Sequence, residues 1–255
     1  MIKLSKGSMP EVLKKNGEKW TQIVLDRIAN NEKPTPSETG RYKHTEIKRA
    51  LISETCGKCA YCESKLLHIH HGDVEHFVPK SLDPARTFDW NNLILACEIC
   101  NQSKSDIDPH INFIINPYIT DPGDHLIFSG PLIFSKGTPQ GKSTIRILKL
   151  DRAQLYEARK DRAEKVTKIM ENLFDSRLTS VERKAIYKDL IDVEASRSEQ
   201  YSAMIREMIR SIEWRLPSDI RSDESTIVPL SPTQSAVLSG QEEISANVVE
   251  KPIAP

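Results

Sequence analysis

Two pairs of cysteines bracket a stretch of the chain that is rich in residues able to do chemistry. Cys59 and Cys62 form one Cys-x-x-Cys pair, and Cys97 and Cys100 form a second, with 34 residues between the pairs. Four thiolates satisfy the tetrahedral coordination of zinc, so this spacing predicts a structural Zn²⁺ site. All four positions on such an ion are filled, so it would organise the fold, and any reaction must be carried out by other residues.

The first cysteine pair has an alternative register, because Cys56 stands three residues before Cys59 and also forms a Cys-x-x-Cys pair. The spacing rule fits both pairs. We favour Cys59 with Cys62, since Tyr61 between them and Glu63 after them give the more compact turn. Cys56 is then a spare thiol.

Oxygen and nitrogen donors lie between and just after the cysteine pairs. Glu75 and His76 are adjacent, and Asn101 directly follows the second pair. Carboxylate and amide oxygens suit a hard ion such as Mg²⁺ or Mn²⁺, so Glu75 and Asn101 are predicted to bind a catalytic ion. His76 should point to the other face of its strand, where an imidazole with a pKa of about 6.5 can accept a proton from water. This is the chemistry of one-metal phosphodiester cleavage.

Three further side chains flank this group. Asp73 precedes Glu75 by two residues on the same strand face, so it either helps to hold the ion or has a simple surface role. Lys80 and Lys104 stand beside the site on the strand and on the helix. Each is expected either to contact a phosphate of a nucleic acid or to be ordinary solvated surface.

The elements that must position these residues are short. Between the cysteines the pattern predicts strand, strand and helix, with strands at 65–68 and 73–78 and a helix from Trp90 or Asn91 to about 103, capped by Asp89. Earlier in the chain, apolar residues at helical spacing predict helices over 10–29, with Pro10 in the first turn, and over 45–53.

The rest of the chain is predicted to be a small β meander followed by helices. Turn residues punctuate short apolar runs such as 126–128, 132–134 and 145–148. Asp151 can cap a helix to about 174, and Thr179 with Glu182 has the form of a capping box for a long helix to about 216. The remaining residues are rich in Pro, Ser and Glu and lack aromatic residues, which predicts a disordered tail.

These elements predict an α+β protein with five regions. They are an N-terminal helical segment (1–55), a metal-organised module (56–110), a small β meander (111–150), a C-terminal helical hairpin (151–216) and the tail (217–255).

Composition limits the function classes. The chain has 36 basic and 36 acidic residues, so its net charge gives no electrostatic case for a polyanionic partner, and a nucleic-acid function must come from a site. No run of about 18 apolar residues is present, which argues against a membrane span. The first residues lack the apolar region of a secretory signal, so the cytoplasm is the expected compartment.

The combined motifs resemble the HNH endonuclease family, which has the ββα-metal fold. The likeness covers 56–108 and rests on the two Cys-x-x-Cys pairs, the carboxylate-His-hydrophobic-x-Pro segment, an Asn-Leu and a closing Cys-Asn-x-x-Lys. It implies that Glu75 and Asn101 bind the catalytic metal and that His76 is the general base. It also implies that Asn92 fixes the loop that holds the histidine. Many HNH proteins have Asp where this chain has Glu75, which would move the ion slightly.

A narrower likeness, through Cys-x-Tyr-Cys-Glu and Glu-His-Phe-x-Pro-Lys, is to the HNH subunits of Septu anti-phage systems, some of which accompany retrons. It implies an ATPase partner of the ABC or SMC type, with a retron reverse transcriptase and its nucleic acid as a further possible partner. DNA is the expected substrate. The alternatives are structured RNA as the substrate, or a zinc-stapled adaptor that binds nucleic acid or a partner without cutting. The region 151–216 is the expected docking surface for the partner.

Overall fold

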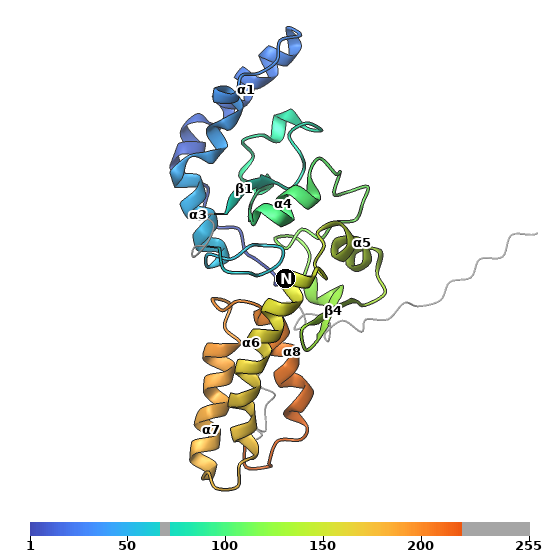
Figure 1. Ribbon diagram of the computed structural model, residues 1–255. Coiled ribbons are helices and arrows are strands. Elements are labelled where there is room, and N and C mark those ends of the chain that lie inside the picture. Colours follow the sequence, from blue (N-terminus) through green and yellow to red (C-terminus); the bar gives the residue numbers. More distant parts are fainter. Residues whose placement is uncertain (67–71, 221–255) are drawn as a thin grey trace, which may run out of the picture.

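The computed structural model describes residues 1–66 and 72–220. The chain is elongated, with α1 at one end, the bundle of α6, α7 and α8 at the other, and the strand β1 with helix α4 between them (Figure 1). The α+β class predicted from the sequence is confirmed. Within the described residues, none of the helices combines the length and the apolar character that crossing a membrane requires.

The N-terminal region consists of helices, as predicted. They are α1 (Glu11–Ala29), the short α2 (Pro36–Thr39) and α3 (Thr45–Thr55). Pro10 immediately precedes α1, where its missing N–H costs no helical hydrogen bond. The imidazole of His44 caps α3 by accepting a hydrogen bond from the backbone N–H of Glu46. These helices cover one side of the central module (Figure 1).

The central module is β1 (Asp73–His76), β2 (Leu93–Ala96) and α4 (Glu98–Lys104). The strands pair antiparallel, with Glu75 opposite Ile94 and His76 opposite Leu93. The predicted helix over 90–103 is therefore wrong in its first half, because Leu93–Ala96 is a strand. The predicted strand at 65–68 is represented by an isolated bridge between Lys58 and Lys65, and its residues 67 and 68 lie outside the described part of the chain.

The predicted meander is a single hairpin followed by a helix. Strands β3 (Leu126–Ser129) and β4 (Leu132–Ser135) pair antiparallel. The apolar run at 145–148, predicted as a further strand, instead ends α5 (Pro139–Ile147). Helix α5 packs against β4, so a helix occupies the place of the third strand.

The C-terminal region contains α6 (Ala153–Glu171), α7 (Ser180–Asp189) and α8 (Ser202–Glu213). The capping box of Thr179 and Glu182 is confirmed. The single long helix predicted to 216 is wrong, because a π-helical turn over Leu190–Glu194 and a left-handed Tyr201 (φ 58°) divide it. Arg152, not Asp151, is the N-cap of α6. Of the predicted tail, residues 221–255 lie outside the described part of the chain.

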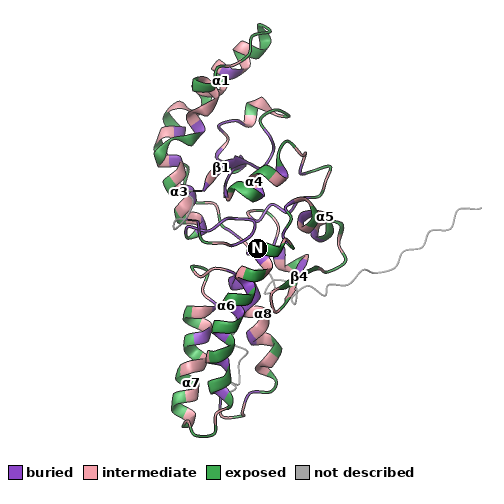
Figure 2. Cartoon of the chain, viewed as in Figure 1, coloured by how far each residue is buried: buried purple, intermediate pink, exposed green. Residues whose placement is uncertain are grey.

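The buried residues gather around the β1–β2 pair (Figure 2). Leu93, Ile94 and Leu95 are all fully buried, although neighbouring side chains of a strand point to opposite faces. Both faces are therefore covered. Helix α4 lies against β1, and α3 lies against β2. The short strands are held by what packs on them, which fixes the direction of each side chain they carry.

Candidate active site and zinc centre

Helix α4 packs on the face of β1 that carries Asp73 and Glu75. Two contacts define this packing. The Nδ2 atom of Asn101 donates a hydrogen bond to Oδ2 of Asp73 at 3.1 Å, and Nζ of Lys104 lies 2.7 Å from Oε1 of Glu75. Alternation along the strand puts the two carboxylates on one face, and a spacing of three puts Asn101 and Lys104 on one side of the helix. The structure therefore brings both predicted metal ligands to the same strand–helix junction.

Glu75 is engaged at both of its oxygens. Lys104 holds Oε1, and the hydroxyl of Tyr61 donates to Oε2 at 2.8 Å. Glu75, Lys104 and Tyr61 are all buried, and Lys104 also donates to the carbonyl of His76 at 2.9 Å. Burial raises the pKa of Glu75, while the Lys104 ammonium and the Tyr61 hydroxyl act in the opposite direction. The sequence-based expectation that Lys104 contacts phosphate or is solvated surface is therefore wrong.

His76 is held from the side opposite its free nitrogen. Its Nε2 lies 2.9 Å from the carbonyl oxygen of Thr87, and the ring of Tyr42 meets the imidazole edge-on at 4.4 Å between centroids. A carbonyl oxygen only accepts, so Nε2 carries the proton and Nδ1 keeps a lone pair. Burial lowers the pKa of His76 to about 4, so the ring is neutral at pH 7. Nδ1 is therefore unprotonated and able to accept a proton, but burial makes it a weaker base than the imidazole with a pKa of about 6.5 expected from the sequence.

Asn92 ties together the loop that follows β1. Its Oδ1 accepts from the backbone N–H of Val78 at 2.8 Å, and its Nδ2 donates to the carbonyls of Val78 at 2.9 Å and Arg86 at 3.2 Å. The side chain is fully buried. Asn92 thus pins both ends of the loop that delivers the Thr87 carbonyl to His76, which agrees with the loop-fixing role implied by the family resemblance.

The four predicted zinc ligands converge. The sulfur atoms of Cys59, Cys62, Cys97 and Cys100 all lie within 4.8 Å of one another. A zinc–sulfur bond of roughly 2.3 Å separates the sulfurs of a tetrahedral site by about 3.8 Å. Cys62 and Cys97 are 3.9 Å apart at sulfur. The donor set and its spacing therefore fit Zn²⁺. Cys56 is exposed and stands outside the group.

The C-terminal region contacts the cysteine cluster. The guanidinium of Arg152 lies 3.8 Å from the sulfur of Cys100. The Ser64 hydroxyl lies 3.3 Å from the sulfur of Cys62 and 3.0 Å from the hydroxyl of Tyr201. N–H and O–H groups around a metal thiolate stabilise its charge and orient it. The zinc site thus joins the central module to the helices that follow it.

Sequence reasoning missed three contributors. Tyr61 was considered only for the compact turn between Cys59 and Cys62, and its hydroxyl donates a hydrogen bond to Glu75. Lys104 stands three residues after Asn101, a spacing that could have indicated a shared helix face. Thr87 acts through its backbone carbonyl, which leaves no signal in residue type. Asp73, considered as a helper at the ion, contacts Asn101 directly.

The oxygen donors fit a hard divalent ion in their chemistry. Asp73 and Asn101 are half-buried, and Asp73 binds the amino end of the Asn101 amide, so the amide oxygen is turned elsewhere and remains a donor. Glu75 is the third side chain with oxygen donors, but its carboxylate already forms an ion pair with the Lys104 ammonium. Asp73, Glu75 and Asn101 are therefore the residues that could hold Mg²⁺ or Mn²⁺.

Comparison with known proteins gives two consistent results. The family model described as HNH endonuclease matches residues 59–106. The Septu protein PtuB of Bacillus mycoides (strain KBAB4) is 27% identical over 194 residues, which cover 62% of this chain and 66% of that protein. The Septu protein PtuB of Bacillus thuringiensis is 35% identical over 106 residues, which cover 41% of each chain. The chain thus matches less than two thirds of each relative's length.

The matched region contains the four clustered cysteines, Asp73, Glu75, His76, Asn92, Asn101 and Lys104. It begins at the first cysteine of the zinc cluster, includes β1, β2 and α4, and ends two residues after Lys104. The resemblance to HNH endonucleases and to Septu proteins is confirmed. Residues 59–106 of this chain match the HNH endonuclease family model over the whole strand–strand–helix unit.

Proposed function

We propose that the chain is a metal-dependent endonuclease that hydrolyses phosphodiester bonds, with DNA as its substrate. The observation that supports this most directly is the hydrogen bond between Nε2 of His76 and the Thr87 carbonyl. It leaves Nδ1 as a proton acceptor on the residue that directly follows Glu75 in β1. The other face of the same strand carries the oxygen donors Asp73 and Glu75.

In this mechanism His76 removes a proton from the attacking water at Nδ1. Asn92 and the Thr87 carbonyl keep the imidazole in the required tautomer and orientation. Glu75 and Asn101, assisted by Asp73, would hold Mg²⁺ or Mn²⁺. When bound, such an ion supplies Lewis-acid stabilisation of the charge on the phosphate and on the leaving oxygen. The cysteine-bound zinc would hold β1, β2 and α4 in register.

The test is cleavage of labelled DNA and RNA by the full chain in Mg²⁺ or Mn²⁺, alone and with its partner. His76→Ala should abolish cleavage, while both the zinc content and the fold are retained. His44→Asn is a matched control, because asparagine is also a good N-cap and His44 only caps α3. Undiminished cleavage by His76→Ala would refute the assigned base. Cleavage of RNA alone would refute DNA as the substrate. Nucleic-acid binding with no cleavage under any condition would favour the adaptor alternative.

We further propose that the chain is the nuclease subunit of an anti-phage complex with an ATPase of the ABC or SMC type. The similarity to two Septu proteins supports this placement. The helices α6, α7 and α8 project away from the HNH domain (Figure 1). Large apolar residues are exposed on α7 (Val181), in the π-helical turn that follows it (Val193) and at the C-terminal end of α8 (Trp214). Such residues are typical of a protein contact. Co-purification of the ATPase with the full chain should be lost when Trp214 and Val181 are both changed to Asp, and retained in a Lys15→Asp control.

A further inference from the structure

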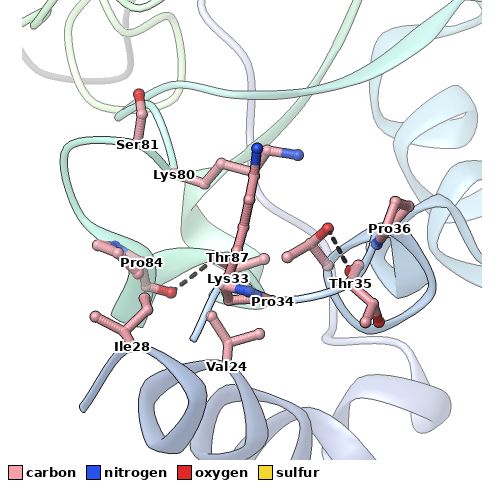
Figure 3. Close-up of a pocket in the computed structure, with 11 residues that line it drawn as sticks. Val24, Ile28, Lys33, Pro34, Thr35, Pro36, Lys80, Ser81, Pro84 and Thr87 are labelled. Atoms are coloured by element: carbon pink, nitrogen blue, oxygen red, sulfur yellow. Dashed lines mark hydrogen bonds between the residues drawn. The ribbon is translucent and has the colours of Figure 1, made fainter. Parts of the chain in front are cut away.

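A pocket of about 790 Å³ lies beside the HNH domain, between α1, the α1–α2 connection and the loop after β1 (Figure 3). This volume falls in the range of roughly 300–1,000 Å³ that binding sites for small organic ligands occupy. Three parts of the chain that are distant in sequence form its walls. The lining residues include Val24, Ile28, Lys33, Pro34, Lys80 and Pro84.

The pocket adjoins the catalytic histidine. Thr87 lines it, and the carbonyl of the same residue holds Nε2 of His76. Lys80 also lines it, with its ammonium 5.0 Å from the ring centroid of Tyr42, which in turn contacts His76 edge-on. Thr87 is therefore shared by the pocket and the segment that holds His76, and Lys80 and Tyr42 form a second link between them.

The charged residues that line the pocket are two lysines, which stand among the hydroxyl groups of Thr35, Thr39, Ser81 and Thr87. Lys33 and Lys80 come from facing walls (Figure 3), and Lys43 lies near Lys80 over the same Tyr42 ring. Across the described residues, none of these three lysines has a carboxylate within ion-pair distance. Partial burial and the Lys43 ammonium lower the pKa of Lys80. A ligand that complements the charge of these three lysines is therefore an anion.

The remaining wall is apolar. Val24 and Ile28 come from α1, and Pro34 and Pro84 come from the two facing segments. Ile28 is 43% exposed, so its side chain remains open to contact by a ligand. A bare inorganic anion would leave this surface wet. A ligand with one anionic group and one flat, weakly polar group would use both halves, and a nucleotide has that composition.

We propose that this pocket binds a nucleotide of the substrate strand next to the scissile phosphate. The phosphate lies against Lys33 and Lys80, and the sugar and base lie against Ile28, Pro34 and Pro84. This inference rests on the proposed nuclease function, because it assigns part of the grip on the same substrate. It adds Ile28, Lys33 and Pro34, which lie outside the residues that the HNH family model matches, to Lys80 and Pro84 within them.

The experiment measures binding without cleavage. The full-length chain carries His76→Ala, no divalent ion is added, and fluorescence anisotropy of a labelled DNA strand and of its duplex is followed over a range of salt concentrations. Adding Lys33→Glu should weaken binding several-fold and lower the slope of log K against log salt by about one, as expected for a lost phosphate contact. Lys15→Glu makes the same charge change on α1 outside the pocket and should leave the slope unchanged.

A second variant tests the shape of the pocket. Ile28→Trp fills the apolar wall without changing charge, so it should weaken binding while the salt slope stays the same. Ile119→Trp makes the same change at an exposed position outside the pocket and should have no effect. Equal affinity of Lys33→Glu and Lys15→Glu, or unchanged affinity of Ile28→Trp, would overturn the proposal. Either result would refute the nucleotide pocket even if the unmodified chain cleaves DNA normally. A failure of the pocket proposal can therefore be distinguished from a failure of the proposed nuclease function.

Discussion

Asp73 accepts a hydrogen bond from the side-chain amide of Asn101 at 3.1 Å. Only the amino end of an amide can donate to a carboxylate, so this contact decides which way the Asn101 side chain faces. The amide oxygen, which is the end that binds metal ions, is thereby set on the other side. A strand residue thus orients a helix residue across the strand–helix junction.

The first prediction concerns this orientation. Asp73→Asn should weaken binding of Mn²⁺ by roughly tenfold, because the new amide lets Asn101 adopt either orientation and outer contacts of this kind contribute about 10- to 100-fold to metal affinity. Titration calorimetry of Mn²⁺ into the zinc-loaded chain measures the effect. Glu98→Gln, on the exposed side of α4, removes the same charge and should leave the affinity as it is. Equal affinities for the two variants would show that Asp73 does not act on Asn101.

The second prediction concerns the buried ion pair of Glu75 and Lys104. Lys104→Met should lower the free energy of unfolding by about 3–5 kcal/mol, because it leaves a buried carboxylate without its cation. Combining it with Glu75→Gln should restore part of that loss, since the uncompensated charge is then gone. Urea unfolding of zinc-loaded protein gives both values. A double variant less stable than Lys104→Met alone would contradict the pairing.

Asn92 gives a third prediction, because its neighbour Asn91 is an exposed control of the same type. Asn92→Ala leaves the buried backbone N–H and carbonyl of Val78 without their Asn92 partner, and each such group costs about 1–3 kcal/mol. The loop would also release the Thr87 carbonyl from His76, so cleavage should fall more than the loss of folded protein explains. Comparing unfolding free energy and cleavage rate for the two alanine variants separates these effects.

Zinc content provides a fourth prediction. Cys56→Ser should retain the full zinc content, because Cys56 is exposed and lies outside the sulfur cluster. Cys59→Ser should lose the metal and unfold the HNH domain, since small metal sites supply much of the folding free energy of their modules. Elemental analysis and circular dichroism measure the two consequences. Zinc loss in Cys56→Ser would mean that the alternative register of the first cysteine pair is the one used.

The zinc ligands and helix starts could be predicted from the sequence because local spacing determines them. Cys-x-x-Cys places two thiolates on one turn whatever surrounds it, and the Thr179–Glu182 capping box is a local hydrogen-bond pattern. The strand Leu93–Ala96 could not be identified in this way. Buried on both faces, it shows an unbroken apolar run that lacks the alternation of a half-buried strand and can equally be a helix.

Side-chain partners were the least predictable feature of the site. Glu75 and His76 are adjacent, and their different environments follow from what packs on each face of β1, α4 on one side and Tyr42 on the other.

The interruption near 190–201 of the long C-terminal helix predicted from the sequence also depends on tertiary contacts. The amphipathic pattern there continues across it, whereas Lys58 and Lys65 bond Glu199 from the zinc knuckle and fix the chain in a non-helical path.

The last prediction compares two helical glycines. Glycine lowers helix stability by about 1 kcal/mol relative to alanine, so Gly→Ala normally stabilises a helix. Gly17, in α1, has only the Phe88 carbonyl, at 4.0 Å, near an added Cβ, and Gly17→Ala should raise the free energy of unfolding. At Gly141, in α5, a Cβ would lie 2.4 Å from the backbone oxygen of His125 and 2.6 Å from Oγ of Ser135. Backbone cannot move aside cheaply, so Gly141→Ala should destabilise the packing of α5 on the β3–β4 hairpin by about 1–3 kcal/mol. Thermal unfolding of both variants checks the opposite signs, and a gain in stability at Gly141 would mean that α5 does not approach the hairpin this closely.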